Sequence, residues 1–460
     1  MLTPSLMHHL SIVPDFRQAW KVQHQLSDIL FLTVCAVICG AEGWDEIEDF
    51  GHAKLDFLRQ YGDFEAGVPS HDTLARVMAL VNAEQLQSAF AEWMKACHDV
   101  TEGAVVAIDG KTLRGSYCRG KGKGAIHMVS AFSAANGVVL GQVKTAEKSN
   151  EITAIPELLK LLNLQGCLVT IDAMGCQKKI ATQILQKGAD YLLSVKDNQP
   201  ALADAFEAAF PMAKVASFEG DAYVTDEKNR GRQETRYHIV SDVTEEFQEL
   251  SYEWPGLKTV GVVMSFRQEG DGVPEAPMIR YYISSADLSA KKLAEAARQH
   301  WHVENKLHWS LDVALREDAC KIHRGQAAEN LARMRHIALN YLKGETRFKG
   351  GIRRKQKKAA LDETYLADIL AVYDFSCVFP DGGRQRRGIL GHRSLQMQRA
   401  VVLHGDGEDE QRTIIAVIQQ GSNLLGHGEV ADVLAVPVNC AEVANIEKLI
   451  ESQVGDHPMA

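Results

Sequence analysis

The sequence lacks the features that mark secreted, zinc-binding or membrane-spanning proteins. Its nine cysteines form no Cys-x-x-Cys pair and are odd in number, so neither a zinc ribbon nor a disulfide framework is favoured. The longest apolar run, residues 29–41, is too short to span a bilayer, which needs about 20 apolar residues. No basic-then-apolar leader follows the first methionine, so we expect no signal peptide. These absences predict a cytoplasmic protein in a reducing compartment, with no membrane association.

The sequence also has no overall excess of positive charge. Its formal net charge is −10 at pH 7, which argues against passive binding to a polyanion. A DNA enzyme remains compatible, because phosphate contacts depend on local patches and an acidic catalytic site lowers the total charge. With 460 residues, of which 46% are hydrophobic, the chain is long enough for several globular domains.

Residues 1–100 predict an N-terminal helical domain. Apolar residues recur at spacings of three and four in four segments, which are residues 25–41, 45–61, 71–81 and 83–98. Ser70 is placed to cap the third of these helices, and Asp72 falls in its first turn. Both a DNA-binding helix-turn-helix and a purely structural bundle fit this pattern.

Short apolar strands replace the helical pattern from residue 104 onward. Residues 104–108 (AVVAI) and 167–171 (CLVTI) predict strands that are buried on both faces and that end at Asp109 and Asp172. The dipeptide Asn136-Gly137 predicts a hairpin between two further strands. The whole order is three strands, a helix, a strand, a helix and a strand, which fits the RNase H-like fold.

The remaining segments complete an α/β prediction. Four strand-like segments predict an all-β insertion over residues 212–285, and helical patterns return after it. We therefore expect an RNase H-like catalytic core formed by residues 101–211 and 286–345. A basic segment, residues 346–372, and a C-terminal extension of unknown role, residues 373–460, follow.

The two strand-end aspartates suggest metal-ion chemistry. A carboxylate at the end of a buried strand loses hydration energy unless a partner compensates it, and a metal ion is one such partner. Asp109 and Asp172 on neighbouring strands, with a third acid from a helix, can hold two divalent ions about 4 Å apart. Mg²⁺, or Mn²⁺ in its place, suits such oxygen ligands. The alternative is that each aspartate is only a cap or turn residue.

The third acid is expected on a helix that includes residues 298–312 (RQHWHVENKLHWSLD). His300, Glu304, His308 and Asp312 recur every four residues and so share one face of that helix. Glu304 is the candidate third ligand, and Asp312 is the alternative third acid. A zinc site from His300, Glu304 and His308 is less favoured, because the pattern is not His-Glu-x-x-His. A polar helix face with no metal is the remaining alternative.

Basic side chains near these acids are candidate DNA contacts that would position the duplex through its phosphates. The candidates are Lys111 and Arg114 after the first aspartate, Arg230, Arg232 and Arg236 in the insertion, and Arg353, Arg354 and Lys355 in the basic segment. Solvated surface is the alternative reading for each group.

Three segments resemble the motifs of the H-repeat-associated insertion-sequence transposases. They are residues 107–116 (AIDGKTLRGS), residues 170–177 (TIDAMGCQ) and residues 300–309 (HWHVENKLHW) with the downstream Leu-Asp-Val and Arg-Glu-Asp. The resemblance covers about residues 8–372. It implies an RNase H-like core, an associated N-terminal helical domain and a β insertion before the third acid.

The same resemblance implies a DDE transposase that cleaves and transfers DNA strands at the ends of a mobile element. Asp109, Asp172 and Glu304 would be its catalytic and metal-binding acids, with two Mg²⁺ or Mn²⁺ ions. Its partner would be double-stranded DNA, both element ends and target. A homodimer on DNA is expected, in a bacterial protein that associates with the nucleoid when it is bound.

The sequence departs from the wider superfamily around the third acid. Relatives often carry Tyr and Arg before the catalytic Glu and Lys after it, where this chain has Ala297, His300 and Leu311. The roles of those residues in holding DNA ends are therefore reassigned or lost. Two functional alternatives also remain, which are an RNase H-like nuclease without strand transfer and an inactive DNA-binding relic. An adenylylating nucleotidyltransferase is disfavoured, because Ala107 stands where its nucleophilic lysine would be.

Overall fold

The computed structural model divides the chain into two units, Met1–Phe379 and Pro380–Ala460. In the first unit it describes residues 6–97, 103–117, 124–145, 151–211, 218, 220–229, 231–269 and 276–373. In the second unit it describes a three-stranded antiparallel sheet of β10 (Ala400–Val401), β11 (Arg412–Val417) and β12 (Val433–Val438). The sequence over residues 440–452 has a pattern typical of a helix, but these residues lie outside those that the structure describes.

The N-terminal part of the first unit is helical, as the apolar spacing predicts. Its α-helices are α1 (Leu6–Ser11), α2 (Leu26–Ile38), α3 (Trp44–Ala53), α4 (Leu55–Leu58), α5 (His71–Leu80) and α6 (Ala83–Cys97). The Ser70 side chain accepts a hydrogen bond from the Thr73 N–H, which confirms it as the cap of α5. Helix α2, which holds most of the longest apolar run, is buried along nearly its whole length. Among the described residues, none of the helices is both long and apolar enough to cross a lipid bilayer.

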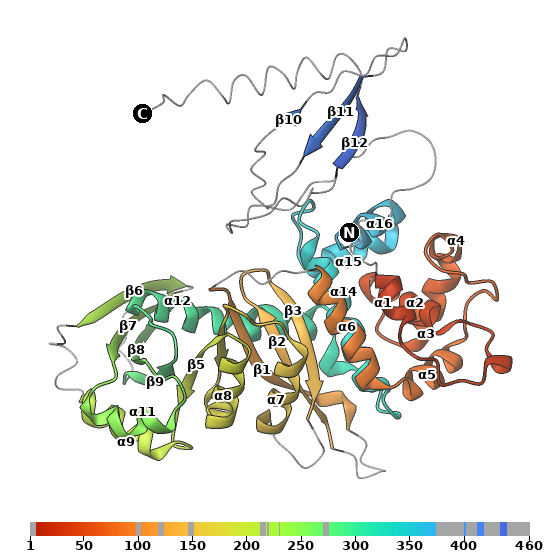
Figure 1. Ribbon diagram of the computed structural model, residues 1–460. Helices are drawn as coiled ribbons and strands as arrows, with labels where there is room; N and C mark the ends of the chain where they lie inside the picture. Colours follow the sequence, from red (N-terminus) through yellow and green to blue (C-terminus); the bar gives the residue numbers. More distant parts are fainter. Residues whose placement is uncertain are drawn as a thin grey trace. The chain divides into compact units, whose positions relative to one another are not determined.

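A nine-stranded sheet forms the centre of the unit, in the order β3-β2-β1-β4-β5-β9-β8-β7-β6 (Figure 1). Its core strands are β1 (Val105–Leu113), β2 (Ile126–Ser133), β3 (Val138–Lys144), β4 (Leu168–Ile171) and β5 (Asp190–Val195). Strands β1, β4 and β5 are parallel to one another. On the other side of β1, β2 pairs antiparallel with β1, and β3 pairs antiparallel with β2. This mixed α/β arrangement is the RNase H-like core that the order of elements predicts.

The predicted β insertion continues the same sheet. Its strands are β6 (Asp221–Asn229), β7 (Arg232–Asp242), β8 (Thr259–Glu269) and β9 (Met278–Ser284). Strand β9 pairs antiparallel with β5 and so joins the insertion to the core. Within the described part of the insertion, a short helix, α11 (Gln248–Glu253), lies between β7 and β8. The strands that the structure describes form long antiparallel pairs, as the turn-separated strand patterns indicate.

Helices cover both faces of the core strands. Helices α7 (Glu151–Leu161) and α8 (Lys178–Gln186) lie on one face (Figure 1). Helix α12 (Ala290–His300) packs on the opposite face, where Leu293 belongs to the same apolar cluster as Val105 of β1. It contacts β6, β7 and β8 as well as β1 and β4. Helix α12 therefore runs from the insertion to the core and delivers the chain that follows it to the end of β4.

The last helices join the helical domain to the core. Helix α14 (Ala327–Gly344) is buried along nearly its whole length and contacts α2, α5, α6 and β3. Helices α15 (Ile352–Leu361) and α16 (Glu363–Leu370) follow in the segment predicted to be basic. The domain bounds expected from the sequence stay predictions, since the N-terminal helices and the core share one continuous apolar cluster.

Candidate active site

Asp109 and Asp172 lie side by side where two parallel strands part. Ile108 of β1 is in register with Ile171 of β4, so the next residue on each strand is an aspartate. Because side chains alternate along a strand, both aspartates project to the face that α12 covers. Strand β4 ends at Ile171 as predicted, but β1 continues to Leu113 because β2 pairs with it over that length. The expectation that the first strand ends at Asp109 is therefore wrong.

The backbone fixes the Asp172 carboxylate. Its side chain caps the short turn Ala173–Gly175 and accepts hydrogen bonds from Met174 N at 3.1 Å and Gly175 N at 3.4 Å. These bonds lower the pKa of Asp172, but burial and the nearby Glu151 carboxylate raise it more. The carboxylate is held in one orientation at an electrostatically unfavourable position.

Glu304 lies on a π-helical turn, Val303–His308, rather than on a continuous α-helix. The Trp309 N–H donates to the Glu304 carbonyl oxygen, five residues back, before α13 (Trp309–Val313) begins. The prediction of one continuous helix through residues 298–312 is therefore wrong, because α12, the π-helical turn and α13 follow one another there. The wider turn keeps Val303 and Leu307 buried while the Glu304 side chain stays exposed. Turns of this kind often occur at functional sites.

The three acids are close enough to affect one another. Burial, with smaller contributions from the Glu151, Asp172 and Glu304 carboxylates, raises the pKa of Asp109 to about 7. Burial also raises the pKa of Glu304, with Asp172 acting in the same direction and Arg280 against it. The site is thus a group of carboxylates whose negative charge is only partly compensated by the protein.

Glu151, the first residue of α7, is a fourth acid at this site and was not predicted from the sequence. Its Oε1 atom lies 2.7 Å from His127 Nε2, and His127 Nδ1 lies 2.9 Å from Thr112 Oγ1. A Cβ atom at Gly110 would collide with Glu151 Oε1 and His127 Nε2, so this pair packs directly on the backbone next to Asp109. The one local signal in the sequence is the glycine that follows the first aspartate.

The histidines of the third motif serve the same edge of the sheet. His300 Nδ1 lies 3.0 Å from Thr170 Oγ1 of β4, and His308 Nδ1 lies 3.7 Å from Asp109 Oδ2. Burial lowers the pKa of each to about 4, so both side chains are neutral at pH 7. His300 therefore does not supply the positive charge that an arginine would have at this position.

Asp312, the alternative third acid, belongs to a different group of charges. Lys111 is the centre of that group, because its Nζ lies close to three carboxylates: 2.7 Å from Asp312 Oδ1, 3.3 Å from Glu317 Oε2 and 2.9 Å from Asp318 Oδ1. Only 10% of the Lys111 side chain is exposed. We name these four residues the Lys111 cluster. Lys111 forms ion pairs within the protein and is therefore not available to bind DNA.

The other predicted DNA contacts differ in exposure. Arg114, Arg353 and Arg354 are exposed, and the Arg354 guanidinium lies 5.0 Å from the Phe348 ring. Lys355 is instead buried and donates to the carbonyl oxygens of Leu342 and Glu345, which makes it a structural residue.

The arginines expected from the insertion are also partly committed. Arg236 pairs with Glu227 at 3.2 Å and with Glu234 at 2.8 Å, and Arg232 lies 3.4 Å from Glu234. Arg230 lies outside the described residues. The insertion therefore carries much less free positive charge than its sequence suggests.

The carboxylate oxygens are ligands of the kind that a divalent cation prefers, but the side chains do not converge on one point. Oxygen donors suit Mg²⁺ and Mn²⁺, and a cation would offset the repulsion that raises the pKa values of Asp109, Asp172 and Glu304. Within the segments that the structure describes, no group of three or more His, Cys, Asp or Glu side chains is arranged so that it could hold a metal ion. This includes the zinc site considered for His300, Glu304 and His308.

Comparisons with known proteins agree with the motifs. A family model described as the transposase DDE domain matches residues 101–341, and a model for a domain associated with it matches residues 7–94. YhhI of Escherichia coli (strain K12), named as an H repeat-associated transposase candidate, is 56% identical over 369 residues, which are 80% of this chain and 97% of YhhI. YbfL of the same strain is 55% identical, over 80% of this chain and 97% of its own.

Two further matches are more limited. The protein named inactive transposase YbfQ, from Escherichia coli (strain K12), is 72% identical over 16% of this chain and 88% of its own. The solved synaptic complex of the piggyBac transposase with hairpin DNA has a TM-score of 0.36 and 11% identity, over 82% of this chain and 79% of that one. A structural similarity this low supports no argument about this chain.

Proposed function

Because the chain belongs to the family of transposases with a DDE domain, we propose that it cleaves insertion-sequence ends and joins them to target DNA. Asp109, Asp172 and Glu304 are its catalytic acids. The observation that carries the assignment is the register of β1 and β4, which makes Asp109 and Asp172 neighbours. Glu304 is close enough to raise the pKa of Asp109.

The family generally uses divalent metals, and we propose that these three acids hold two Mg²⁺ or Mn²⁺ ions. When bound, such ions activate the attacking oxygen and stabilise the leaving oxygen of a phosphoryl transfer. The protein contributes the acids, two of which are neighbours on adjacent strands. Asp172 is fixed by two backbone N–H groups, and Glu304 comes from the π-helical turn.

Glu151 acts as a positioning residue in this proposal. Its bond to His127 and the missing side chain at Gly110 hold its carboxylate beside Asp109. Neutral His308, 3.7 Å from Asp109 Oδ2, restricts the same aspartate from the other side. These contacts favour one arrangement of Asp109, which phosphoryl transfer requires because the reacting atoms must be aligned.

Glu304 is preferred to Asp312 as the third acid because of their different partners. Asp312 Oδ1 lies 2.7 Å from Lys111 Nζ, whereas Glu304 has no ion pair among the described residues. A carboxylate that is already neutralised by a lysine is a poorer metal ligand than one that is not.

Double-stranded DNA, both element ends and target, is the proposed substrate. Strand transfer must bring two ends together, so we propose a homodimer on DNA. A nuclease without strand transfer and an inactive relic are the competing functions, and one relative is named inactive.

The test is a plasmid assay with the element ends, purified full-length protein and Mg²⁺ or Mn²⁺. Asp109→Asn and Asp172→Asn should abolish cleavage while binding to the same DNA persists. Sequencing of the products distinguishes joined ends from simple breaks. Robust cutting by either variant would sink the assignment of the acids, and breaks without joining would identify a nuclease.

A further inference from the structure

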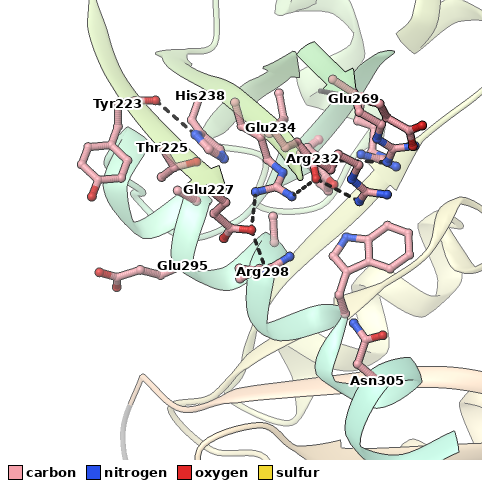
Figure 2. Close-up of a pocket in the computed structure, with 18 residues that line it drawn as sticks. Tyr223, Thr225, Glu227, Arg232, Glu234, His238, Glu269, Glu295, Arg298 and Asn305 are labelled. Atoms are coloured by element: carbon pink, nitrogen blue, oxygen red, sulfur yellow. Dashed lines mark hydrogen bonds and ion pairs between the residues drawn. The ribbon is translucent and has the colours of Figure 1, made fainter. Parts of the chain in front are cut away.

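A pocket of about 650 Å³ lies between the β insertion and α12, next to the turn that carries Glu304 (Figure 2). Trp301 and Asn305, which stand before and after Glu304 in the third motif, form part of the pocket wall. Five arginines also line it, and they are Arg232, Arg236, Arg267, Arg280 and Arg298. So many arginines beside an acidic catalytic site suggest a place for a polyanion, provided that their charge is free.

Four of these arginines form ion pairs within the pocket, and they share two glutamates. Glu227 lies 3.2 Å from Arg236 and 3.0 Å from Arg298. Glu234 accepts the other pairs, at 3.4 Å from Arg232, 2.8 Å from Arg236 and 4.0 Å from Arg267. Figure 2 shows ion pairs of this group within the pocket. The pairs hold β6, β7, β8 and α12 together and fix the four guanidinium groups, although two carboxylates do not offset all of their charge.

Arg280 is the exception. It lies on β9, opposite Val263 of β8, and no Asp or Glu among the described residues is within ion-pair distance of it. Its guanidinium instead lies 5.2 Å from the centre of the Trp301 ring, a cation–π contact that orients the side chain without neutralising it. Arg280 also acts on Glu304 electrostatically, since it lowers the pKa of that carboxyl against the effect of burial.

Arg280 supplies a positive charge that this chain lacks at the positions where its third motif departs from that of relatives. The helix that precedes Glu304 carries no cation where relatives have Tyr and Arg, because Ala297 is apolar and His300 is buried and neutral at pH 7. Leu311, where relatives have Lys, is fully buried. Arg280 brings positive charge to the same region from the β insertion. A planar guanidinium held on an aromatic ring is well suited to bind phosphate oxygens in a bidentate way.

We propose that Arg280, oriented by Trp301, binds a backbone phosphate of the DNA strand that is cut at Glu304. The inference rests on the proposed function and names the side chain that holds its substrate. Arg232, Arg236, Arg267 and Arg298 shape the pocket through their glutamates and do not bind the strand. The β insertion thereby supplies one specific contact rather than a general basic surface.

The experiment compares Arg280→Gln with Arg298→Gln, a matched loss of charge in the same pocket at a residue that is ion-paired with Glu227. Binding of a fluorescent mixed-sequence DNA duplex is measured over a range of salt concentrations. Arg280→Gln should reduce the log–log salt slope by about one unit, and Arg298→Gln should leave it nearly unchanged. Cleavage of the element ends should fall about tenfold or more in Arg280→Gln, as expected for a lost charged hydrogen bond.

Two further variants separate charge from orientation. Arg280→Lys should restore the salt slope but only part of the cleavage rate, because an ammonium group cannot reproduce the planar contact. Trp301→Leu should keep the slope and lower the cleavage rate. Melting temperatures of all four variants identify any loss that comes from misfolding.

The outcomes for this inference and for the proposed function are distinct. If Arg280→Gln and Arg298→Gln have equal salt slopes and equal cleavage rates, the proposed role of Arg280 is wrong. Cleavage by the wild-type protein would still support the proposed function in that case. A wild-type protein that binds DNA but never cuts it overturns the function, and the two salt slopes still decide whether Arg280 holds a phosphate. Failure of wild-type protein to bind the duplex overturns both.

Discussion

Two groups of carboxylates surround two residues of strand β1, Asp109 and Lys111, which are two positions apart. The first contains Asp109 with Glu151, Asp172 and Glu304, and it has no lysine or arginine ion-paired within it among the described residues. The second is the Lys111 cluster, in which one lysine is shared by three carboxylates. Their sequence neighbourhoods are similar, but one group is left repulsive and the other is neutralised. Under the proposed function, the repulsive group is the one that holds the metal ions.

The largest effect is expected from removing the lysine of the second group. Lys111→Met leaves Asp312 and Glu317, which is only 2% exposed, without their lysine. Breaking a buried ion pair in this way should cost about 3–5 kcal/mol of the free energy of unfolding. Urea denaturation measures it, with Lys160→Met as the control, since 61% of the Lys160 side chain is exposed. Similar losses in the two variants would show that Lys111 is no more committed than a surface residue.

The opposite sign is expected in the first group. Burial, with the neighbouring acids, raises the pKa of folded Asp109 from 3.8 to about 7. The ionised form is therefore disfavoured in the folded state, and stability falls as the pH rises from about 4 to about 7. Asp109→Asn removes this penalty, so without metal it should be more stable than wild type by on the order of 1–4 kcal/mol at pH 8.

The pH dependence of that difference is its control. Below the unfolded pKa of 3.8 both states hold the proton, so the advantage of Asp109→Asn should disappear there. Denaturation curves at several pH values measure the trend. An asparagine variant that is less stable than wild type at pH 8 would contradict the repulsion between these acids.

A smaller effect should follow from added metal. Mg²⁺ or Mn²⁺ at saturating concentration should stabilise the wild type by about 1–3 kcal/mol, because only the folded protein presents the acids together. Thermal melts with and without the ion measure this difference. Asp109→Asn should gain less, and NaCl at equal ionic strength serves as the control for screening. Equal gains in both proteins would place any bound ion elsewhere.

The smallest effect concerns the exposed arginines outside both groups. Arg353→Gln with Arg354→Gln should change the free energy of unfolding by less than about 0.5 kcal/mol. If both side chains touch phosphates, the salt slope of DNA binding should fall by about two units. An unchanged slope would restrict DNA contacts to other surfaces, and Lys357→Gln is a control in the same helix.

The fold, and the position of Asp109 and Asp172 at neighbouring strands, could be predicted from the sequence because they depend on local patterns. Runs of apolar residues placed Asp109 and Asp172 at neighbouring strands, and the order of elements predicted the sheet. The π-helical turn around Glu304 was not predicted, since the i+4 spacing of its polar residues also fits an ordinary helix. Glu151 was missed because its role depends on packing against Gly110, 41 positions earlier in the chain.

Charged side chains were the least predictable part of the site. Lys111 is a cation in the sequence, but its partners lie some two hundred residues later. Arg236 meets Glu227 only when β6 and β7 pair, whereas Glu234 lies two residues away on its own strand. Sequence shows which charges are present, whereas the fold decides which of them stay uncompensated. Arg280, the pocket arginine without a carboxylate partner, was not among the predicted DNA contacts for this reason.

The two groups on β1 make their sharpest contrast at the third acid. Glu304 belongs to the repulsive group and Asp312 to the neutralised one, so the most direct measurement is the cleavage of element ends by Glu304→Gln and Asp312→Asn. Each protein is tested at saturating Mn²⁺ and at equal DNA occupancy. We predict no detectable cleavage by Glu304→Gln and substantial cleavage by Asp312→Asn. Active Glu304→Gln with inactive Asp312→Asn would contradict the account and assign the third acid to the Lys111 cluster.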